Sequence, residues 1–427
     1  MGKFGARYLN SMRADSGFKR PKDRVLIVGA GHAGASAAAY LRQQGFQGSI
    51  SLIGEECMVP YQRPPLSKAW LLGKSSEEDI LLRPRSFYEQ NNIDLVLGLR
   101  VEALDRDARG LKLSDGSEIF YDRLVLATGA RARRMNFAGS GRAALLELRT
   151  AIDAEQLKDA LKPESCVVII GGGYIGLEAA ASARMLNAKV TVIEREKRVI
   201  ARVACAELSG FFEGYHRDRG VQFRFSQSVV SVETDTKGRK TVTLADGERL
   251  FADVVLMGVG AVPNQELAAA AGLECEDGIV VDADARTADP FIYAIGDCTR
   301  RPLALYQRTW RLESVPNALE QAMQATAAIC ARPAPAMEVP WFWSDQYDLK
   351  LQIAGLPFDV QQLVVRGDPQ SGRFAVFHLD ACNRLQAVEA INAVPEFVVG
   401  RRLIASRGQV NAQRLKDPKI SMKEIAA

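Results

Sequence analysis

The sequence has no long apolar segment and almost no excess of one charge. No stretch approaches the roughly 18 uncharged apolar residues that a membrane helix requires, so we expect no membrane partner. The 55 Lys and Arg residues against 51 Asp and Glu leave a net charge of only +4, which argues against a dedicated nucleic-acid-binding protein. Residues 1–22 are polar and basic and lack the apolar core of a secretory signal, so we expect a disordered N-terminal extension.

Paired or clustered metal ligands are also missing from the sequence. The seven cysteines are scattered, with no Cys-x-x-Cys and no metal-ligand spacing, and their odd number disfavours a disulfide framework. We interpret them as reduced thiols of a cytoplasmic protein. The three histidines, His32, His216 and His378, form no sequence cluster. We therefore predict no metal site.

What the chain does contain is an internal repeat. Residues 24–29 and 167–172 are short apolar runs that enter a glycine turn, an alanine-rich helix and a second strand ending in an acid. Residues 111–130 and 242–261 each contain two strand-like runs joined by an Asp-Gly hairpin turn. With 427 residues, enough for two to three domains, the repeat predicts an α/β protein with two Rossmann-type dinucleotide-binding domains.

The pattern changes after Pro263. A strand-like run over Phe291–Ile295 ends in Gly296-Asp297, and a helix is expected from Pro316 to Cys330. A proline-rich linker follows at 331–336. Strands are then expected over 349–354, 362–365, 373–378 and 385–391, followed by one short terminal helix. This segment predicts a small C-terminal α+β domain.

The first glycine fingerprint is Gly29-x-Gly31-x-x-Gly34, placed after a strand and before a helix. In this motif the first glycine makes a tight turn, the second lets backbone approach a pyrophosphate, and the third lets helix pack on strand. Glu55 follows the second strand and is placed to accept a ribose hydroxyl. A generic glycine turn is the alternative.

The second fingerprint is Gly171-x-Gly173-x-x-Gly176, with Glu194 at the end of the next strand. An acid there binds ribose hydroxyls and repels a 2′-phosphate, so NADH is expected to be preferred over NADPH at least about tenfold. We expect the adjacent Arg195 to point to solvent. Two dinucleotide sites suggest a flavin with a nicotinamide, because flavin accepts a hydride and releases single electrons.

Several motifs occur in order along the chain: PYQRPPLSK (60–68), LATGARAR (126–133), IIGGGYIGLE (169–178), GVGAVPN (258–264), AIGDC (294–298), ESVPNALEQA (313–322) and PWFWSDQY (340–347). Together they resemble the ferredoxin reductases of bacterial oxygenase systems, the family of putidaredoxin reductase, rhodocoxin reductase and the Rieske dioxygenase reductases. The resemblance implies a glutathione-reductase-like fold. It divides the chain into an extension (1–22), a split FAD-binding domain (23–134 and 263–332), an NAD-binding domain (135–262) and a C-terminal domain (333–427).

The same resemblance implies a set of FAD contacts. These are Ala33, Glu55, Arg63, Lys68, Val101, Arg133, Asp297 and Val315, and Gly260 is a further cofactor-binding position. Asp297 could accept ribityl hydroxyls or cap a turn. The helix that starts near Val315 offers a positive dipole end for reduced flavin. Arg63 and Lys68 flank a rigid Pro-Pro and could face the flavin or lie in a plain surface loop.

Three residues are candidates for the catalytic centre. Glu178, on the helix after the second glycine motif, could face the nicotinamide and pair with Lys68, or have a purely structural partner. Trp343 is expected to cover the flavin edge where electrons leave, with core packing as the alternative for it or for Trp341.

The expected activity is hydride transfer from NADH to FAD, then single-electron transfer to a 2Fe-2S ferredoxin that serves a bacterial oxygenase. The redox cysteine pair of disulfide reductases is missing, since only Cys57 lies near the required place. A rubredoxin reductase, an NADH oxidase and a redox-sensing flavoprotein without turnover are the alternatives. We expect a monomer or weak dimer.

An acidic ferredoxin requires a basic docking surface near the flavin. Arg300, Arg301, Arg308 and Arg311 lie between Asp297 and the helix at Pro316. We therefore predict that this cluster rims the site, and that charge reversal at Arg301 and Arg311 raises the KM for ferredoxin. An ordinary solvated loop is the alternative.

Overall fold

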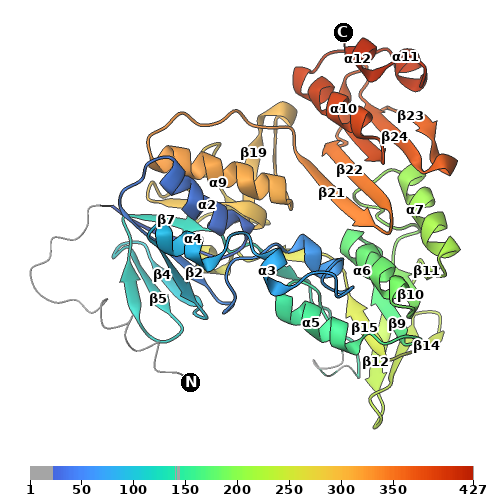
Figure 1. Cartoon of the computed structure of the whole chain (residues 1–427), viewed down its shortest axis with the longest axis horizontal. Helices are drawn as coiled ribbons and strands as arrows, with labels where there is room; N and C mark the ends of the chain where they lie inside the picture. The colour runs from blue at the N-terminus through green and yellow to red at the C-terminus, as the bar shows by residue number, and fades with distance from the viewer. Residues whose placement is uncertain (1–22, 140, 142–144, 427) are drawn as a thin grey trace, which may run out of the picture.

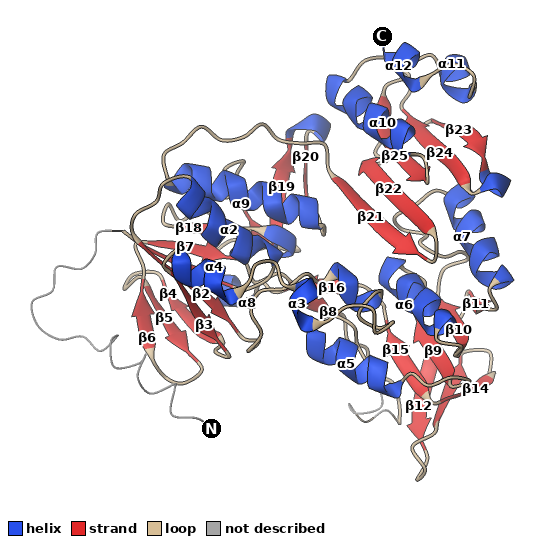
Figure 2. Cartoon of the chain, in the orientation of Figure 1, coloured by secondary structure: helices blue, strands red, loops and turns tan. Residues whose placement is uncertain are grey.

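The computed structural model describes residues 23–139, 141 and 145–426. The predicted extension at 1–22 lies outside the described residues. Figure 1 and Figure 2 show two sheet units side by side, with a third unit at the C-terminal end. The two repeats of the sequence form the first two units.

The first unit is a parallel sheet in the order β18-β7-β1-β2-β3. Its strands are β1 (Arg24–Val28), β2 (Ser49–Gly54), β3 (Ile93–Leu97), β7 (Arg123–Leu126) and β18 (Ile292–Ala294). Helices α2 (His32–Gln43) and α9 (Val315–Ile329) pack together over one face. Alanine fills the buried face of α2, which lets the helix approach the sheet closely.

Smaller elements surround this sheet. They are helices α3 (Glu77–Ile80) and α4 (Arg85–Gln90), the antiparallel strands β4 (Val101–Asp105), β5 (Gly110–Leu113) and β6 (Glu118–Phe120), and the strands β17 (Ile279–Val280), β19 (Thr299–Leu303) and β20 (Arg308–Trp310). Short 3₁₀ turns η1 (Pro64–Ser67) and η3 (Gly296–Cys298) carry two of the predicted site segments.

The second unit repeats the plan as a parallel sheet in the order β11-β10-β9-β15. Its elements are β9 (Cys166–Ile170), α6 (Tyr174–Met185), β10 (Lys189–Glu194), α7 (Ala206–Asp218), β11 (Gln222–Phe225), the antiparallel β12 (Val229–Thr234), β13 (Lys240–Leu244) and β14 (Arg249–Ala252), and β15 (Val254–Met257). Helix α5 (Ala151–Ala160) precedes it and α8 (Glu266–Ala270) follows it. The expected Asp-Gly turns at 115–116 and 246–247 join β5 to β6 and β13 to β14.

The chain passes between the two units twice. Strands β8 (Ala130–Ala132) and β16 (Ala261–Pro263) pair antiparallel at this crossing. The predicted boundary at 134/135 lies two residues after β8, and the one at 262/263 lies within β16.

The third unit is an antiparallel sheet in the order β21-β22-β25-β24-β23. Its strands are β21 (Trp341–Gln346), β22 (Leu349–Gly355), β23 (Gln362–Asp368), β24 (Arg373–Leu379) and β25 (Leu385–Ile391). The expectation of one short terminal helix was wrong, because α10 (Val394–Ser406), α11 (Ala412–Lys416) and α12 (Met422–Ala426) follow. Buried Leu349, Leu351 and Phe374 share one apolar core with the second unit, which fixes the C-terminal unit against it.

Candidate active site

The first glycine turn has the geometry that a pyrophosphate requires. Gly29 has φ +112°, and a Cβ there would lie 2.1 Å from the carbonyl oxygen of Ala127. A Cβ on Gly34 would lie 1.9 Å from the carbonyl oxygen of Gly29, whereas one on Gly31 would meet nothing within 4 Å. The N-terminus of α2 has neither a capping side chain nor an acid in its first turn. This open, positively polarised cradle fits a dinucleotide phosphate.

The second turn repeats this geometry. Gly171 has φ +107°, and a Cβ there would lie 2.4 Å from the carbonyl oxygen of Gly258. A Cβ on Gly176 would lie 2.3 Å from the carbonyl oxygen of Gly171, and the space beside Gly173 is open. Helix α6 also starts without a side-chain cap or an early acid. Two separate cradles therefore fit two dinucleotides.

The acids that follow the second strands differ in their contacts. Glu55 is exposed directly after β2. Glu194 ends β10 and accepts hydrogen bonds from the backbone amides of Gly172 at 2.7 Å and Glu196 at 2.9 Å. Its carboxylate is thus fixed beside the glycine turn. The prediction that Arg195 points to solvent is confirmed, since its side chain is 79% exposed.

Lys68 and Glu178 meet at the junction of all three units. Lys68 Nζ lies 2.6 Å from Glu178 Oε2, as predicted. Ser67 donates to the same oxygen at 2.5 Å and Ser344 donates to Oε1 at 2.6 Å. Glu178 is buried on α6, yet it is satisfied by three donors, from the end of η1, the residue after it and β21. The contact orients the Lys68 ammonium, while the catalytic role of either residue remains a prediction.

A second network connects the predicted flavin contacts Arg63 and Asp297. Arg63 pairs with Glu56 at 2.8 Å and donates to the carbonyl oxygen of Arg149 at 2.5 Å. Arg149 in turn pairs with Asp297 at 2.9 Å. Burial, together with the positive charge of Arg63, lowers the pKa of nearby His32 to about 4. Each guanidinium is paired with a carboxylate, so the four side chains carry no net charge, and they offer a ligand directed hydrogen-bond donors.

Sequence reasoning missed Arg149. It precedes Thr150, the N-cap of α5, and its partner Asp297 lies 148 positions away. Its Nε atom is buried and has no hydrogen-bond partner among the described residues. An unsatisfied donor beside Asp297 is consistent with a polar ligand at this place.

The remaining predicted contacts lie on separate elements. Ala33 is buried on α2, Val101 starts β4, and Val315 is the first residue of α9 after the capping Ser314. The exposed Arg133 and Gly260 are joined by a backbone hydrogen bond of 2.9 Å beside the β8–β16 pair. Their contacts with a cofactor stay predictions.

The two tryptophans at the start of β21 are half-buried and in contact. Their ring centroids lie 5.7 Å apart, and Trp341 also packs on Phe397 of α10. Trp341 belongs to the apolar core of the C-terminal unit, so the core-packing alternative holds for this residue. Trp343 shares its strand with Ser344, which contacts Glu178.

The predicted arginine docking surface was largely wrong. Arg301 is 1% exposed because it points inward from β19 and pairs with Glu320 at 3.1 Å. Arg311 is 13% exposed and pairs with Asp277 and Glu313. Arg300 is 21% exposed and lies 3.5 Å from Glu276. Only Arg308, at 47%, is freely accessible, and it pairs with Asp359.

All seven cysteines are free thiols, and Cys57 has no cysteine partner. His378, Cys205 and Glu389 nevertheless come together, which their sequence spacing did not indicate. Within residues 23–139, 141 and 145–426, no helix is long and apolar enough to cross a membrane.

Comparison with known proteins adds to this geometry. Residues 23–322 match the pyridine nucleotide-disulphide oxidoreductase family, and residues 341–426 match the reductase C-terminal family. The chain is 48% identical to the probable ferredoxin reductase CtmF of Castellaniella defragrans over 406 residues, which is 95% of this chain and 99% of that protein. It is 43% identical to putidaredoxin reductase CamA of Pseudomonas putida, covering 95% and 97% of the two chains.

The structure is similar to the reductase in a crystal structure of the covalent putidaredoxin reductase–putidaredoxin complex. The TM-score is 0.92 at 42% identity, and the match covers 95% of this chain and 98% of that chain. The predicted fold class is thereby confirmed.

Proposed function

The chain belongs to the pyridine nucleotide-disulphide oxidoreductase family, and we propose that it is an FAD-containing NADH:ferredoxin reductase. When bound, FAD accepts a hydride from NADH and releases electrons one at a time to a 2Fe-2S ferredoxin. The observation that carries the proposal is the pair of open glycine cradles, at Gly31 and Gly173, in a chain without a redox cysteine pair.

We assign FAD to the unit formed by residues 23–134 and 263–332, and NADH to residues 135–262. The α2 amides would hold the FAD pyrophosphate, and Asp297 would accept a ribityl hydroxyl. Arg149, which pairs with Asp297 and has a buried Nε without a partner among the described residues, would donate a hydrogen bond beside it. For NADH, the α6 amides and Glu194 would bind the phosphates and the ribose, respectively.

Lys68 and Glu178 would position the reacting rings. The carboxylate holds the ammonium at 2.6 Å, so that its remaining protons can donate toward a ligand. No cysteine and no acid–base histidine is needed, because hydride transfer moves no separate proton. The C-terminal unit, residues 333–427, would close the site with Trp343.

The proposed partner is a 2Fe-2S ferredoxin that supplies a Rieske-type dioxygenase or a haem monooxygenase. We further propose a monomer or weak dimer in the cytoplasm, where the seven free thiols would remain reduced.

Turnover with NADH, measured in parallel without oxygen and in air, tests the proposal. The flavin-loaded protein should reduce cytochrome c rapidly only when a 2Fe-2S ferredoxin is added. Faster transfer to rubredoxin would favour a rubredoxin reductase, and rapid consumption of oxygen would favour an NADH oxidase. A long-lived complex of reduced flavin and NAD that barely turns over would instead indicate a redox sensor.

A further inference from the structure

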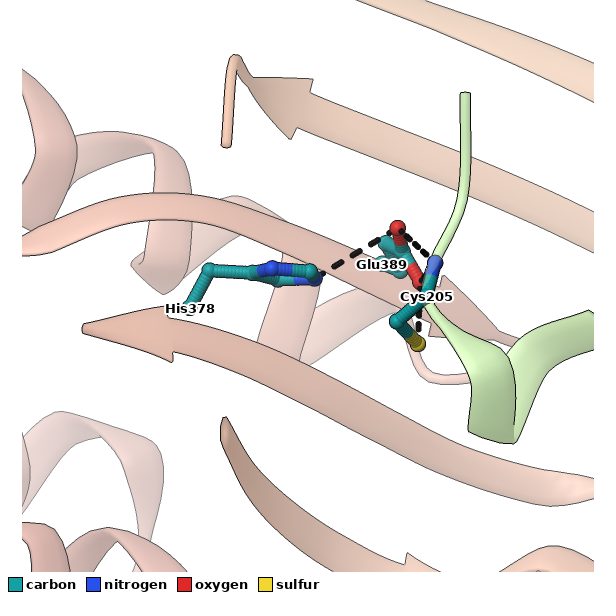
Figure 3. A group of neighbouring side chains, drawn as sticks. All are labelled: Cys205, His378 and Glu389. Carbon is teal, nitrogen blue, oxygen red and sulfur yellow. Dashed lines mark hydrogen bonds and ion pairs between the residues drawn. The ribbon is translucent and has the colours of Figure 1, made fainter. Parts of the chain in front are cut away.

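Three metal-ligating side chains cluster at the contact between the second and third units. Cys205 is the N-cap of α7, whereas His378 and Glu389 come from the adjacent strands β24 and β25 (Figure 3). All three are buried, and their ligand atoms lie within 4.8 Å of one another. The proposed electron transfer uses none of them.

The histidine in this cluster is incompletely satisfied. His378 Nε2 is buried and has no hydrogen-bond partner among the described residues, although Glu389 Oε1 lies 3.4 Å away. The side chains of His378 and Glu389 are only 4% and 2% exposed. A buried imidazole nitrogen without a partner costs free energy. The nitrogen and the carboxylate face the same space (Figure 3).

We propose that Cys205, His378 and Glu389 form a Zn²⁺ site. Thiolate, imidazole and carboxylate are the ligands that Zn²⁺ prefers in proteins. Tetrahedral bonds of about 2.0–2.3 Å place neighbouring ligand atoms roughly 3.3–3.6 Å apart, and the His378–Glu389 distance of 3.4 Å already lies in that range. The Cys205 thiol donates to Glu389 Oε2 at 2.8 Å, which is short for a sulfur donor, and this distance lengthens when the metal replaces the proton.

The cluster is accessible to a hydrated ion. An open pocket of about 400 Å³ is lined by both Cys205 and His378. Val203 and Leu363, which also line it, are among the exposed large apolar residues. The pocket provides an entry path and space for a water molecule as fourth ligand, the arrangement of three protein ligands and one exchangeable site.

Metal binding would add three bonds between two units that already meet through apolar packing and through hydrogen bonds such as Ser344–Glu178 and His216–Gln346. The thiol proton leaves to solvent, and three bonds connect the start of α7 to β24 and β25. The segment before Cys205 contacts the second glycine turn, because the Ile200 amide donates to the Gly172 carbonyl at 2.9 Å. The site exists whether or not the proposed function holds, since none of its residues belongs to the cofactor cradles.

Zinc stoichiometry tests the inference. Flavin-loaded protein is treated with a chelator, dialysed, and titrated with Zn²⁺ in competition with an indicator dye of micromolar affinity. Wild type should take one zinc ion per chain from the dye and gain several degrees in Tm. Cys205→Ser and His378→Gln should lose both effects. Cys382→Ser is the matched control, because Cys382 is an exposed thiol outside the cluster.

Cobalt gives a second readout on the unaltered chain. One equivalent of Co²⁺ should produce a thiolate-to-metal charge-transfer band and tetrahedral d–d bands at wavelengths beyond the flavin absorption. If Cys205→Ser does not fold, the cobalt spectrum of the wild-type protein still tests the proposed site. No thiolate–cobalt band in wild type, or an unchanged zinc content in folded Cys205→Ser, overturns the site.

Discussion

Replacement of Arg301 by methionine should destabilise the first unit severely. The guanidinium is 1% exposed and lies 3.1 Å from Glu320, itself 13% exposed. It also donates to Asn317 at 3.0 Å and Gln324 at 3.1 Å, which lie on the same face of α9. Removal of one partner of a buried ion pair leaves an uncompensated charge and costs about 3–5 kcal/mol.

Urea unfolding followed by flavin release measures this loss. With a slope of roughly 2–3 kcal/mol per M, the midpoint should fall by about 1–2.5 M. Arg308→Met is the matched control, since the Arg308–Asp359 pair is 47% and 74% exposed and a surface pair contributes about 0–1 kcal/mol. A second change, Glu320→Gln, should restore part of the midpoint because it removes the stranded carboxylate. Equal midpoints for Arg301→Met and Arg308→Met would refute the reasoning.

Four further outcomes are expected. Glu194→Gln should reduce the preference for NADH over NADPH about tenfold, or roughly 1.4 kcal/mol, and an unchanged ratio of the two kcat/KM values would remove Glu194 from this role. Lys68→Met should slow flavin reduction by NADH about tenfold or more in stopped flow, since Glu178 loses its cation; a rate equal to that of Lys68→Arg would contradict this. Burial lowers the pKa of His216 to about 4. Near pH 6.5 this histidine therefore takes up a proton in the unfolded chain but stays neutral in the folded chain. The free energy of unfolding should therefore fall by about 1.4 kcal/mol per pH unit as the pH drops from 6.5 to 4. In a plot of the urea midpoint against pH, His216→Phe should lack this contribution to the slope. Parallel plots for wild type and variant would disprove it. Single replacement of each cysteine should leave NADH-dependent dye reduction intact. A folded, flavin-loaded variant without this activity would show that the replaced thiol takes part in hydride transfer.

The elements with strong local signals could be predicted from the sequence. An apolar run that enters a glycine turn predicted β1 and β9, and the proline at 316 predicted α9 to within one residue at each end. The Lys68–Glu178 pair was also predicted, as a cation and a carboxylate in two of the motifs on which the resemblance rests. Local pattern and family resemblance together thus gave the architecture and the two cradles.

The predictions that failed concern side chains whose partners lie far away in the sequence. Arg301 occupies an inward position of β19, between buried Thr299 and Leu303. A charged residue in a short polar strand carries no signal of its direction, so it was interpreted as solvated. Arg149 and Asp297, and likewise Cys205 and Glu389, come from distant segments. Only the folded chain brings such partners together.

The position of β18 has a consequence for protein synthesis. This strand completes the first sheet beside β7, yet the ribosome makes it only after the whole inserted unit that begins beyond β8. The unit that contains β9 to β15 can therefore finish folding while the first sheet still lacks its edge strand, Asp297 and α9. Nascent chains that end before residue 292 should contain a folded inserted unit and retain no flavin. The cofactor should therefore bind only after β18, Asp297 and α9 have been synthesised.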